Sequence, residues 1–169
     1  MSEVAPAAII RKATTAEHDE AARVLAACFR EAFSNILSPA ALAALSVERA
    51  RERLGDPAAV NMAAYCDGAM VGVGQAREDW ITLLYLRQSH HGRGIGAQLF
   101  RALCATIRSR GHQQARLWCL HNNWQARRFY EHFGARSILQ EVMHVGGEPL
   151  LHLEYRIPLQ GVADSPPRQ

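Results

Sequence analysis

The sequence predicts a single domain of the α/β class, built on a mixed β-sheet, and three observations support this prediction. Short apolar runs rich in β-branched and aromatic residues, which are typical of strands, alternate with longer segments whose apolar residues recur at helical spacing. The Asp67-Gly68 pair between two such runs indicates an antiparallel hairpin. A strand, a helix and a second strand follow one another over residues 80–120, at the length of a right-handed parallel crossover.

The length and composition of the chain are those of one globular domain. The chain has 169 residues, of which 49% are hydrophobic, and this suits a single full core. We expect residues 1–160 to form the domain and residues 161–169 to form a flexible tail. The N-terminus lacks the pattern of a signal peptide, and no apolar segment approaches the ~18 residues needed to cross a bilayer. We therefore expect a cytoplasmic protein without a membrane partner.

The first third of the chain predicts a strand followed by a pair of helices. The strand is expected over residues 7–13, and Thr14 with Glu17 then forms a capping box. A helix follows, and its apolar face contains Leu25, Cys28, Phe29, Ala32 and Phe33. Pro39 fits the first turn of a second helix, which should end near Gly55.

The rest of the chain predicts six more strands and two more helices. The strands are expected over residues 60–66, 70–76, 81–86, 115–120, 138–145 and 150–157. One helix has the apolar stripe of Leu99, Phe100, Leu103, Cys104 and Ile107 and should end at Gly111. The other begins at Asn123, which can cap it, and ends at Gly134. The last two strands read as a closing hairpin.

A glycine-rich turn at residues 91–96 is the strongest functional signal in the sequence. It links the apolar run 80–86 to the helix that follows, and Gly92, Gly94 and Gly96 alternate within it. Such glycines let successive backbone N–H groups converge, and the start of the helix adds unpaired N–H groups and a positive dipole end. The natural ligand is an anion, most often a phosphate.

The charge around this turn is locally basic. From Trp80 to Tyr130 the sequence contains eight arginines and neither Asp nor Glu, although the formal net charge of the chain is only +3. Several of these arginines fit the solvated face of a helix, but Arg93 lies inside the turn. The basic window is therefore consistent with an anionic ligand at the turn.

Two common phosphate-binding motifs fit this turn poorly. A P-loop needs Gly-Lys-Ser/Thr after the glycines, and this chain has Gly96-Ala97-Gln98. A Rossmann fingerprint matches literally through Gly92, Gly94 and Ala97. However, it requires glycines close to the strand end and an acidic residue about twenty positions later, and no acid appears before Glu131.

The same stretch resembles motif A of the GCN5-related N-acetyltransferase (GNAT) family. In that family a strand ending in a Leu-Tyr-Val-like triplet leads into Q/R-x-x-G-x-G/A. Here the triplet is Leu84, Tyr85 and Leu86, and the turn contains His91, Gly92, Arg93, Gly94, Ile95 and Gly96. His91 departs from the usual Gln or Arg, but its backbone N–H group is unaffected.

A second stretch resembles motif B of the same family, N-x-x-A-x-x-F-Y-x-x-x-G. The matching residues are Asn123, Ala126, Phe129, Tyr130 and Gly134, while Ala135 replaces the usual Phe. The order and separation of the two motifs suit the family. The resemblance implies a GNAT-like mixed, splayed β-sheet of about seven strands, flanked by about four helices, across nearly the whole chain.

The resemblance also implies a reaction, the direct transfer of an acetyl or longer acyl group from coenzyme A to an amine in a ternary complex. By carry-over from the family, amides from Gly92 to Gly96 hold the pyrophosphate and strand amides near Leu84–Leu86 meet the thioester oxygen. Tyr130 matches the acid that protonates the leaving thiolate. Asn123 matches the residue that binds the pantetheine arm. The implied partners are acetyl-CoA and a primary amine of a small molecule or peptide.

The general base is less clear from the sequence. Glu78 and Asp79 precede the strand before the glycine turn, and each also fits a simple turn. His121 follows the predicted strand 115–120 and could face the opening between the two parallel strands, or lie on the surface. We favour His121, because imidazole changes its protonation near neutral pH. The other histidines stay unassigned.

Other binding classes and ligands fit the sequence less well. The four cysteines are far apart and read as reduced core residues, so no metal is expected. A nucleic-acid binder is disfavoured, because no recognition helix or exposed basic-aromatic pattern appears. A coenzyme A sensing module without catalysis remains an alternative function. The family's acceptor site would be framed by residues 33–39 and 146–149, and the chain would be a monomer or a homodimer.

Overall fold

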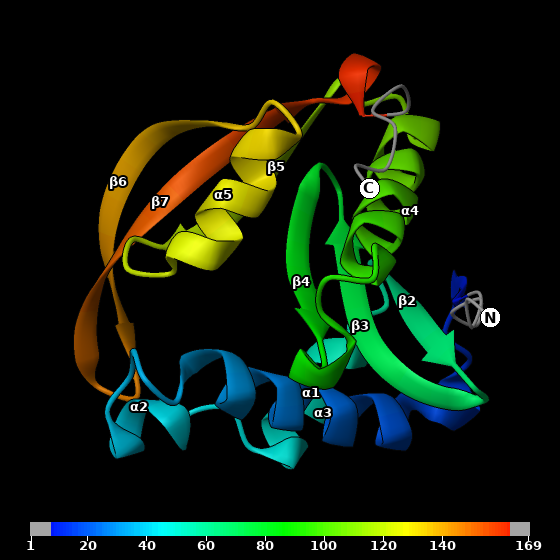
Figure 1. The fold of residues 1–169 in the computed structure, drawn as a ribbon. Coiled ribbons are helices and arrows are strands. Elements are labelled where there is room, and N and C mark those ends of the chain that lie inside the picture. The colour runs from blue at the N-terminus through cyan, green and yellow to red at the C-terminus, as the bar shows by residue number, and fades with distance from the viewer. Residues whose placement is uncertain (1–7, 163–169) are drawn as a thin grey trace, which may run out of the picture.

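A computed structural model describes residues 8–162, in which seven strands form one sheet in the order β1-β2-β3-β4-β5-β7-β6 (Figure 1). Strands β4 and β5 are parallel, and all other neighbouring strands are antiparallel. The strands are β1 (Ile9–Lys12), β2 (Ala59–Cys66), β3 (Ala69–Arg77), β4 (Trp80–Leu86), β5 (Gln114–Leu120), β6 (Arg136–Val145) and β7 (Glu148–Pro158). The α-helices are α1 (His18–Phe33), α2 (Pro39–Leu42), α3 (Val47–Leu54), α4 (Ile95–Ser109) and α5 (Trp124–His132). The predicted mixed sheet is confirmed.

Strands β4 and β5 meet only at their N-terminal ends, and this makes the sheet splayed. Their ladder contains the single pair Trp80 and Arg116. The Asp79 carboxylate accepts hydrogen bonds of 2.7 and 2.8 Å from the Arg116 guanidinium, and Trp80 stacks on Trp118 with 6.0 Å between ring centroids. These contacts hold the N-terminal ends together. The C-terminal ends of the two strands lie apart, as Figure 1 shows.

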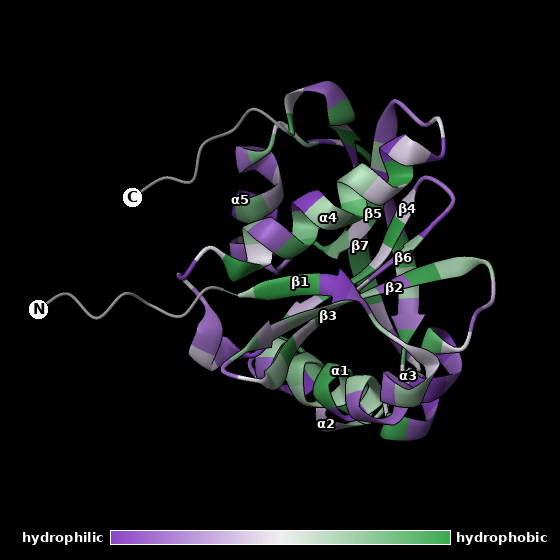
Figure 2. Cartoon of the chain, turned by 90° about the vertical axis from the view of Figure 1, so that its right-hand side faces the viewer, coloured by the Kyte–Doolittle hydropathy of each residue, from purple (hydrophilic) through white to green (hydrophobic). Residues whose placement is uncertain are grey.

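Helices cover both faces of the sheet, so the core has two parts. Helix α1 packs over β3 and β4 on one face, with α3 against α1, and α4 packs over β2, β3 and β4 on the other. Figure 2 shows the sheet between these two layers. The apolar faces predicted for α1 and α4 are buried except at Ala32, which is exposed, and Leu25, Leu99 and Phe100 are fully enclosed.

The segment from Pro39 to Gly55 forms two helices, where the sequence pattern predicted one. Helix α2 ends at Leu42, and α3 begins at Val47. The break occurs at Ser46, whose hydroxyl accepts the Arg49 N–H at 3.2 Å and so caps a new helix. Within residues 8–162 the fold therefore has five α-helices, one more than the count of about four drawn from the sequence.

The turn between β6 and β7 reaches across to α2 (Figure 1). Gly146 has φ +58°, and a Cβ there would lie 2.6 Å from the Ala40 carbonyl oxygen, so the close contact requires glycine. Beside it, the Ser38 hydroxyl donates a 2.5 Å hydrogen bond to the Glu148 carboxylate. The turn of the closing hairpin therefore contacts the N-terminal end of α2.

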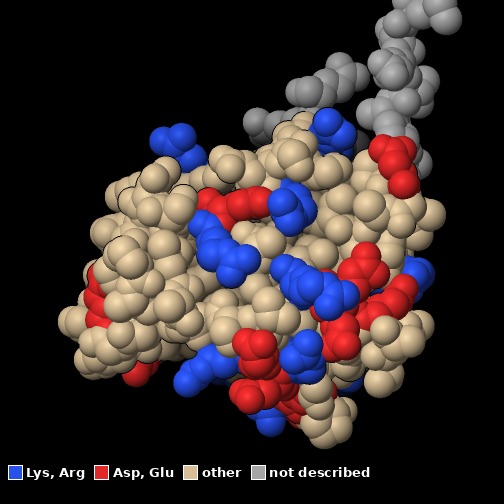
Figure 3. Space-filling model, turned by 90° about the horizontal axis from the view of Figure 1, so that it is seen from below, with Lys and Arg blue, Asp and Glu red and all other residues tan. Residues whose placement is uncertain are grey.

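The surface of the molecule carries charges of both signs. Seen from below the view of Figure 1, the molecule shows acidic and basic side chains interspersed (Figure 3). Among residues 8–162, no helix is long and apolar enough to cross a bilayer.

The short helix η3 (Leu159–Gly161) and the buried Val162 extend the ordered core past residue 160, and the remainder of the expected tail, 163–169, lies outside the described residues.

Candidate active site

A cleft of about 1600 Å³ lies where the C-terminal ends of β4 and β5 separate. We divide its lining into two halves. The glycine-turn half consists of residues from β4, the glycine turn, α4 and α5, namely Leu84, Leu86, His91–Gly94, Gly96–Gln98, Asn123, Ala126, Phe129 and Tyr130. The aromatic half consists mainly of residues from α1, α3, β4, β5 and the closing hairpin, namely Phe29, Phe33, Arg49, Glu52, Arg53, Tyr85, Trp118, Leu120, Val145 and His152.

The glycine turn presents a row of unused backbone donors. Gly92 and Gly94 have φ +75° and +76°, and Gly94 is the N-cap of α4. Among residues 8–162, the N–H groups from Gly92 to Ala97 have no hydrogen-bond acceptor, and the first bonded N–H is that of Gln98. Together with the positive end of the α4 dipole, these donors fit the diphosphate of a nucleotide coenzyme.

Gly96 has a different role from its two neighbours. Its φ is negative, and a Cβ would meet Leu86 and Phe129 only at 3.8 and 3.9 Å, which is ordinary contact. The backbone therefore does not require glycine there. Because Gly96 lines the cleft, its missing side chain instead leaves room for a bound group.

His91 is tied to the protein by both ring nitrogens. Its Nε2 lies 3.0 Å from the Leu86 carbonyl oxygen, and its Nδ1 lies 3.3 Å from the side-chain nitrogen of Gln125 on α5. Because a carbonyl only accepts, Nε2 carries the proton and Nδ1 accepts from Gln125. The imidazole thus connects β4 to α5, while its backbone belongs to the glycine turn.

The last residues of β4 offer backbone groups to the cleft. The Arg87 N–H bonds to Val71 of β3, and such bonds alternate along an antiparallel strand. The N–H and C=O groups of Leu84 and Leu86 therefore face the edge from which β5 has separated. The bond from His91 to the Leu86 carbonyl lies on this edge. The Tyr85 side chain points to the aromatic half, against Phe29.

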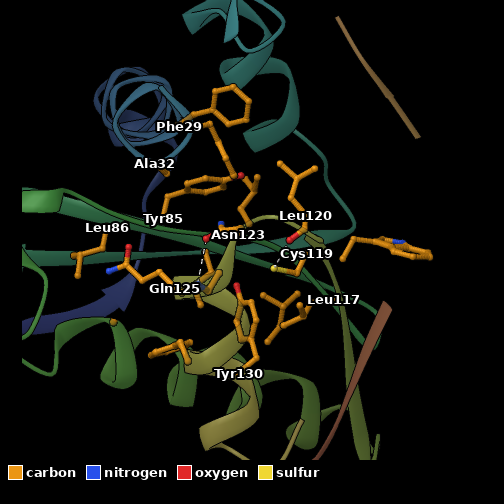
Figure 4. A pocket seen from close by; sticks show the side chains of 18 of the residues that line it. Phe29, Ala32, Tyr85, Leu86, Leu117, Cys119, Leu120, Asn123, Gln125 and Tyr130 are labelled. Carbon is orange, nitrogen blue, oxygen red and sulfur yellow. Dashed lines mark hydrogen bonds between the residues drawn. The ribbon is translucent and has the colours of Figure 1, made fainter. Parts of the chain in front are cut away.

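Tyr130 projects from α5 into the cleft, toward Cys119 and Leu120 (Figure 4). Its ring packs among Phe100, Phe129 and Tyr155, and the residue is 9% exposed. Burial raises the pKa of its hydroxyl far above the usual tyrosine range. Among the described residues the hydroxyl has no hydrogen-bond partner, so it is a neutral donor available to a ligand.

Asn123 caps α5 as predicted and also borders the cleft. Its side-chain oxygen accepts the Ala126 N–H at 3.2 Å, which leaves the amide NH₂ group able to donate (Figure 4). Asn123 and Tyr130 lie on the same helix, so α5 brings both motif B residues to the glycine-turn half.

None of the three residues considered from the sequence as the general base lines the cleft. Glu78 lies in the turn before β4, with φ +52°, at the opposite end of the strand from Leu86. The Asp79 carboxylate forms an ion pair with the Arg116 guanidinium. The His121 ring packs edge-on to Trp124, its Nδ1 lies 3.0 Å from the Asn122 side chain, and the residue does not line the cleft.

His152 is a cleft residue that sequence reasoning left unassigned. It lies on β7 opposite Leu120 of β5 and lines the aromatic half. Its Nδ1 is 2.9 Å from the Leu150 carbonyl oxygen, so Nδ1 carries the proton and Nε2 keeps a lone pair. No motif marks this residue. Only the register between β5 and β7 places it at the cleft.

The aromatic half combines apolar rings with two arginines. Phe29, Phe33 and Tyr85 form one cluster, with ring centroids 4.8 to 6.3 Å apart. Burial raises the pKa of Tyr85 to about 12, and the positive charge of Arg53 partly opposes this rise. The Arg53 guanidinium donates a 3.4 Å bond to the Thr82 carbonyl at the edge of β4.

All four cysteines are free and buried, as predicted. Cys119 borders the cleft, but burial raises the pKa of its thiol to about 12, so it is protonated and a poor nucleophile at neutral pH. Within residues 8–162, no three His, Cys, Asp or Glu side chains gather so as to hold a metal ion.

Comparisons with known proteins identify the family of this chain. The sequence model of the acetyltransferase (GNAT) family matches residues 20–135. An uncharacterized N-acetyltransferase of Mycobacterium bovis is 32% identical over 126 residues, which cover 69% of this chain and 81% of the relative.

Solved structures share the fold. A GCN5-related N-acetyltransferase from Rhodopseudomonas palustris matches with a TM-score of 0.78 and 20% identity, over 94% of this chain and 99% of the other. The PaiA N-acetyltransferase from Thermoplasma acidophilum, solved in complex with coenzyme A, matches with a TM-score of 0.67 and 16% identity, over 88% and 98%. The chain therefore belongs to the GNAT family of acetyltransferases and is an N-acetyltransferase.

Proposed function

We propose that this enzyme transfers an acetyl group from acetyl-CoA to a primary amine by direct attack within a ternary complex. The observation that carries the proposal is the convergence of three kinds of group on one cleft. These are the unused N–H groups from Gly92 to Ala97, the opened edge of β4 and the neutral hydroxyl of Tyr130. Each supplies something that acyl transfer from a thioester requires.

The glycine-turn half suits the coenzyme. The N–H groups of the turn would bind the diphosphate, with Arg93 beside them and the space at Gly96 left open. Asn123 would donate from its free NH₂ group to an amide of the pantetheine arm. The coenzyme A complex of the similar PaiA fold supports this placement.

Residues at the open ends of β4 and β5 would carry out the transfer. As the amine nitrogen bonds to the acyl carbon, the N–H groups of Leu84 and Leu86 stabilise the charge that develops on the carbonyl oxygen. When the carbon–sulfur bond breaks, Tyr130 donates its proton to the departing sulfur. The acetylated amine and the free coenzyme thiol are the products.

The amine must lose a proton, and His152 is the group best placed to take it. Its Nε2 lone pair is open, and it borders the aromatic half beside Leu120. Glu31, another polar group on the lining, is held by Arg87 at 2.8 Å and by the Gln88 N–H at 2.9 Å. We assign His152 as the base in place of His121 and Glu78, acting directly or through a water.

Release of free coenzyme thiol in the presence of an amine panel tests the proposal. We expect steady-state thiol release that depends on the amine, with stoichiometric N-acetyl product by mass spectrometry. Calorimetric binding of acetyl-CoA without turnover for any amine would instead favour a sensing module and contradict the proposal.

A further inference from the structure

The aromatic half is enclosed at the end remote from the glycine turn. The closing hairpin meets α2 through the close approach of Gly146 to Ala40 and through the bond from Ser38 to Glu148. This contact joins the two elements that border the acceptor side of the cleft. An acceptor must therefore fit beneath the contact, which favours a compact molecule over a folded protein surface.

The enclosed space is mostly apolar. Phe29, Phe33 and Tyr85 form one side (Figure 4 shows Phe29 above Tyr85), and Trp118 and Leu120 line the side of β5. Residues of the two loops that flank α2 and of β6 complete the lining, namely Ile36, Leu37, Leu45, Met143 and Val145. Such a wall binds an aliphatic or aromatic body and gains free energy by removing it from water.

The charges in the aromatic half are predominantly positive. Arg49 and Arg53 both line it, and neither forms an ion pair with any residue of the described part of the chain. Arg53 makes one long hydrogen bond, to Thr82, so most of its donors stay available. The carboxylates on the lining do not balance them, because Glu31 is bound to Arg87, and Glu52 is the one other acid among the described residues that line the cleft.

We propose that the acceptor is a compact amine with an apolar or aromatic body and a carboxylate, as in a hydrophobic amino acid, and that Arg53 binds the carboxylate. This rests on the proposed amine acetylation and names its substrate class. The body would occupy the apolar space, the amine would point to Tyr130 and His152, and the carboxylate would face α3. A polycationic amine would meet two arginines and only one unpaired carboxylate, so this site disfavours it.

Matched acceptors test the class. L-phenylalanine, L-phenylalaninamide and spermidine are compared by thiol release at saturating acetyl-CoA. The amide keeps the aromatic body and the amine but lacks the carboxylate. We expect kcat/KM for phenylalanine to exceed that for the amide by about 10- to 100-fold, the usual effect of a charge-assisted contact, and spermidine to be the poorest.

A pair of variants tests whether Arg53 binds the carboxylate of the acceptor. Arg53→Gln should remove the preference for phenylalanine over its amide and leave the calorimetric Kd of acetyl-CoA unchanged. Arg51→Gln is the matched control, because Arg51 lies on the same helix but outside the cleft, paired with Asp19. It should keep the preference, since an exposed ion pair contributes little.

The outcomes separate the two proposals. If the amide or spermidine is acetylated as well as phenylalanine or better, the acceptor class is wrong and amine acetylation stands. If Arg53→Gln lowers kcat/KM equally for phenylalanine and for phenylalaninamide, the proposed contact between Arg53 and the carboxylate is also wrong. If acetyl-CoA binds and no amine releases thiol, both proposals fail together.

Discussion

The two halves of the cleft recognise their ligands by different means. The glycine-turn half uses backbone N–H groups from one continuous stretch, Gly92 to Ala97, and its geometry depends on the φ angles of Gly92 and Gly94. The aromatic half uses side chains from several elements that are distant in sequence, such as Phe29, Arg53, Leu120 and His152. A backbone site constrains which residues can form it, whereas a side-chain site can be built from many combinations.

This difference predicts where a substitution acts. Changes in the glycine-turn half should alter coenzyme affinity with every acceptor. Changes in the aromatic half should alter acceptor use and leave coenzyme affinity intact. Tyr130 is the exception in the glycine-turn half, because its proposed role is to protonate the departing sulfur, and its substitution should affect the transfer step alone.

The largest effect is expected from Gly94→Val. A β-branched residue does not tolerate the left-handed φ of +76°, so the turn should change shape and its N–H groups should no longer converge. Calorimetry should detect no acetyl-CoA binding. Gly111→Val is the control, because it imposes the same strain at φ +92° near the other end of α4. Equal losses of binding in both variants would mean that strain in α4, rather than the phosphate site, is responsible.

Tyr130→Phe should lower kcat by ~10- to 10³-fold and leave the acetyl-CoA Kd nearly unchanged, because it removes a proton donor and keeps the ring. Burial raises the pKa of the hydroxyl, so it remains protonated at alkaline pH. The wild-type pH profile should therefore show no fall from this group below pH ~10, the ordinary tyrosine value. Identical kcat values in stopped assays across the pH range would remove Tyr130 from the mechanism.

His152→Asn should reduce kcat/KM for the amine by ~10²-fold, because it removes the proposed base. His121→Asn, which alters an imidazole outside the cleft, should have little effect. Steady-state kinetics that rank the two variants in the opposite order would restore His121 as the base.

Gly146→Ala should reduce kcat/KM for the amine by about tenfold, because the new methyl group would lie 2.6 Å from the Ala40 carbonyl and displace the hairpin from α2. Gly147→Ala shares the left-handed strain, at φ +83°, but meets no atom within 4 Å. It should cost stability, by about 1–2 kcal/mol in thermal unfolding, and keep acceptor use. A similar kinetic loss in both would show that the contact with α2 is irrelevant.

The smallest effect is expected from His91→Ala. The variant loses the ring's two hydrogen bonds and keeps the backbone of the turn, so acetyl-CoA Kd should rise by only about fivefold, near the value of one ordinary hydrogen bond. A hundredfold rise of the acetyl-CoA Kd in calorimetry would mean that the imidazole itself binds the phosphate. The glycine-turn half would then also depend on a side chain.

The sequence by itself determined the sheet class, the position of the glycine turn and the residues of α5 that face the cleft. These features are local. Gly94 at the N-cap of α4, the Asp67-Gly68 hairpin and the Asn123 cap each follow from the backbone geometry that their residue types allow. The Ser46 cap that splits the second helix was equally local, and the helical composition around it concealed it.

Only the tertiary structure decided which distant side chains meet at the acceptor side. His152 reaches the cleft because β7 pairs with β5 in a register that sets it opposite Leu120, and a shift of one residue would turn it to the other face. Glu78 lies outside the cleft because it precedes the end of β4 at which the two strands stay paired, and His121 lies outside it because its ring packs against Trp124. The register between strands that are distant in sequence, such as β5 and β7, depends on long-range packing, and no local pattern in a single sequence encodes it.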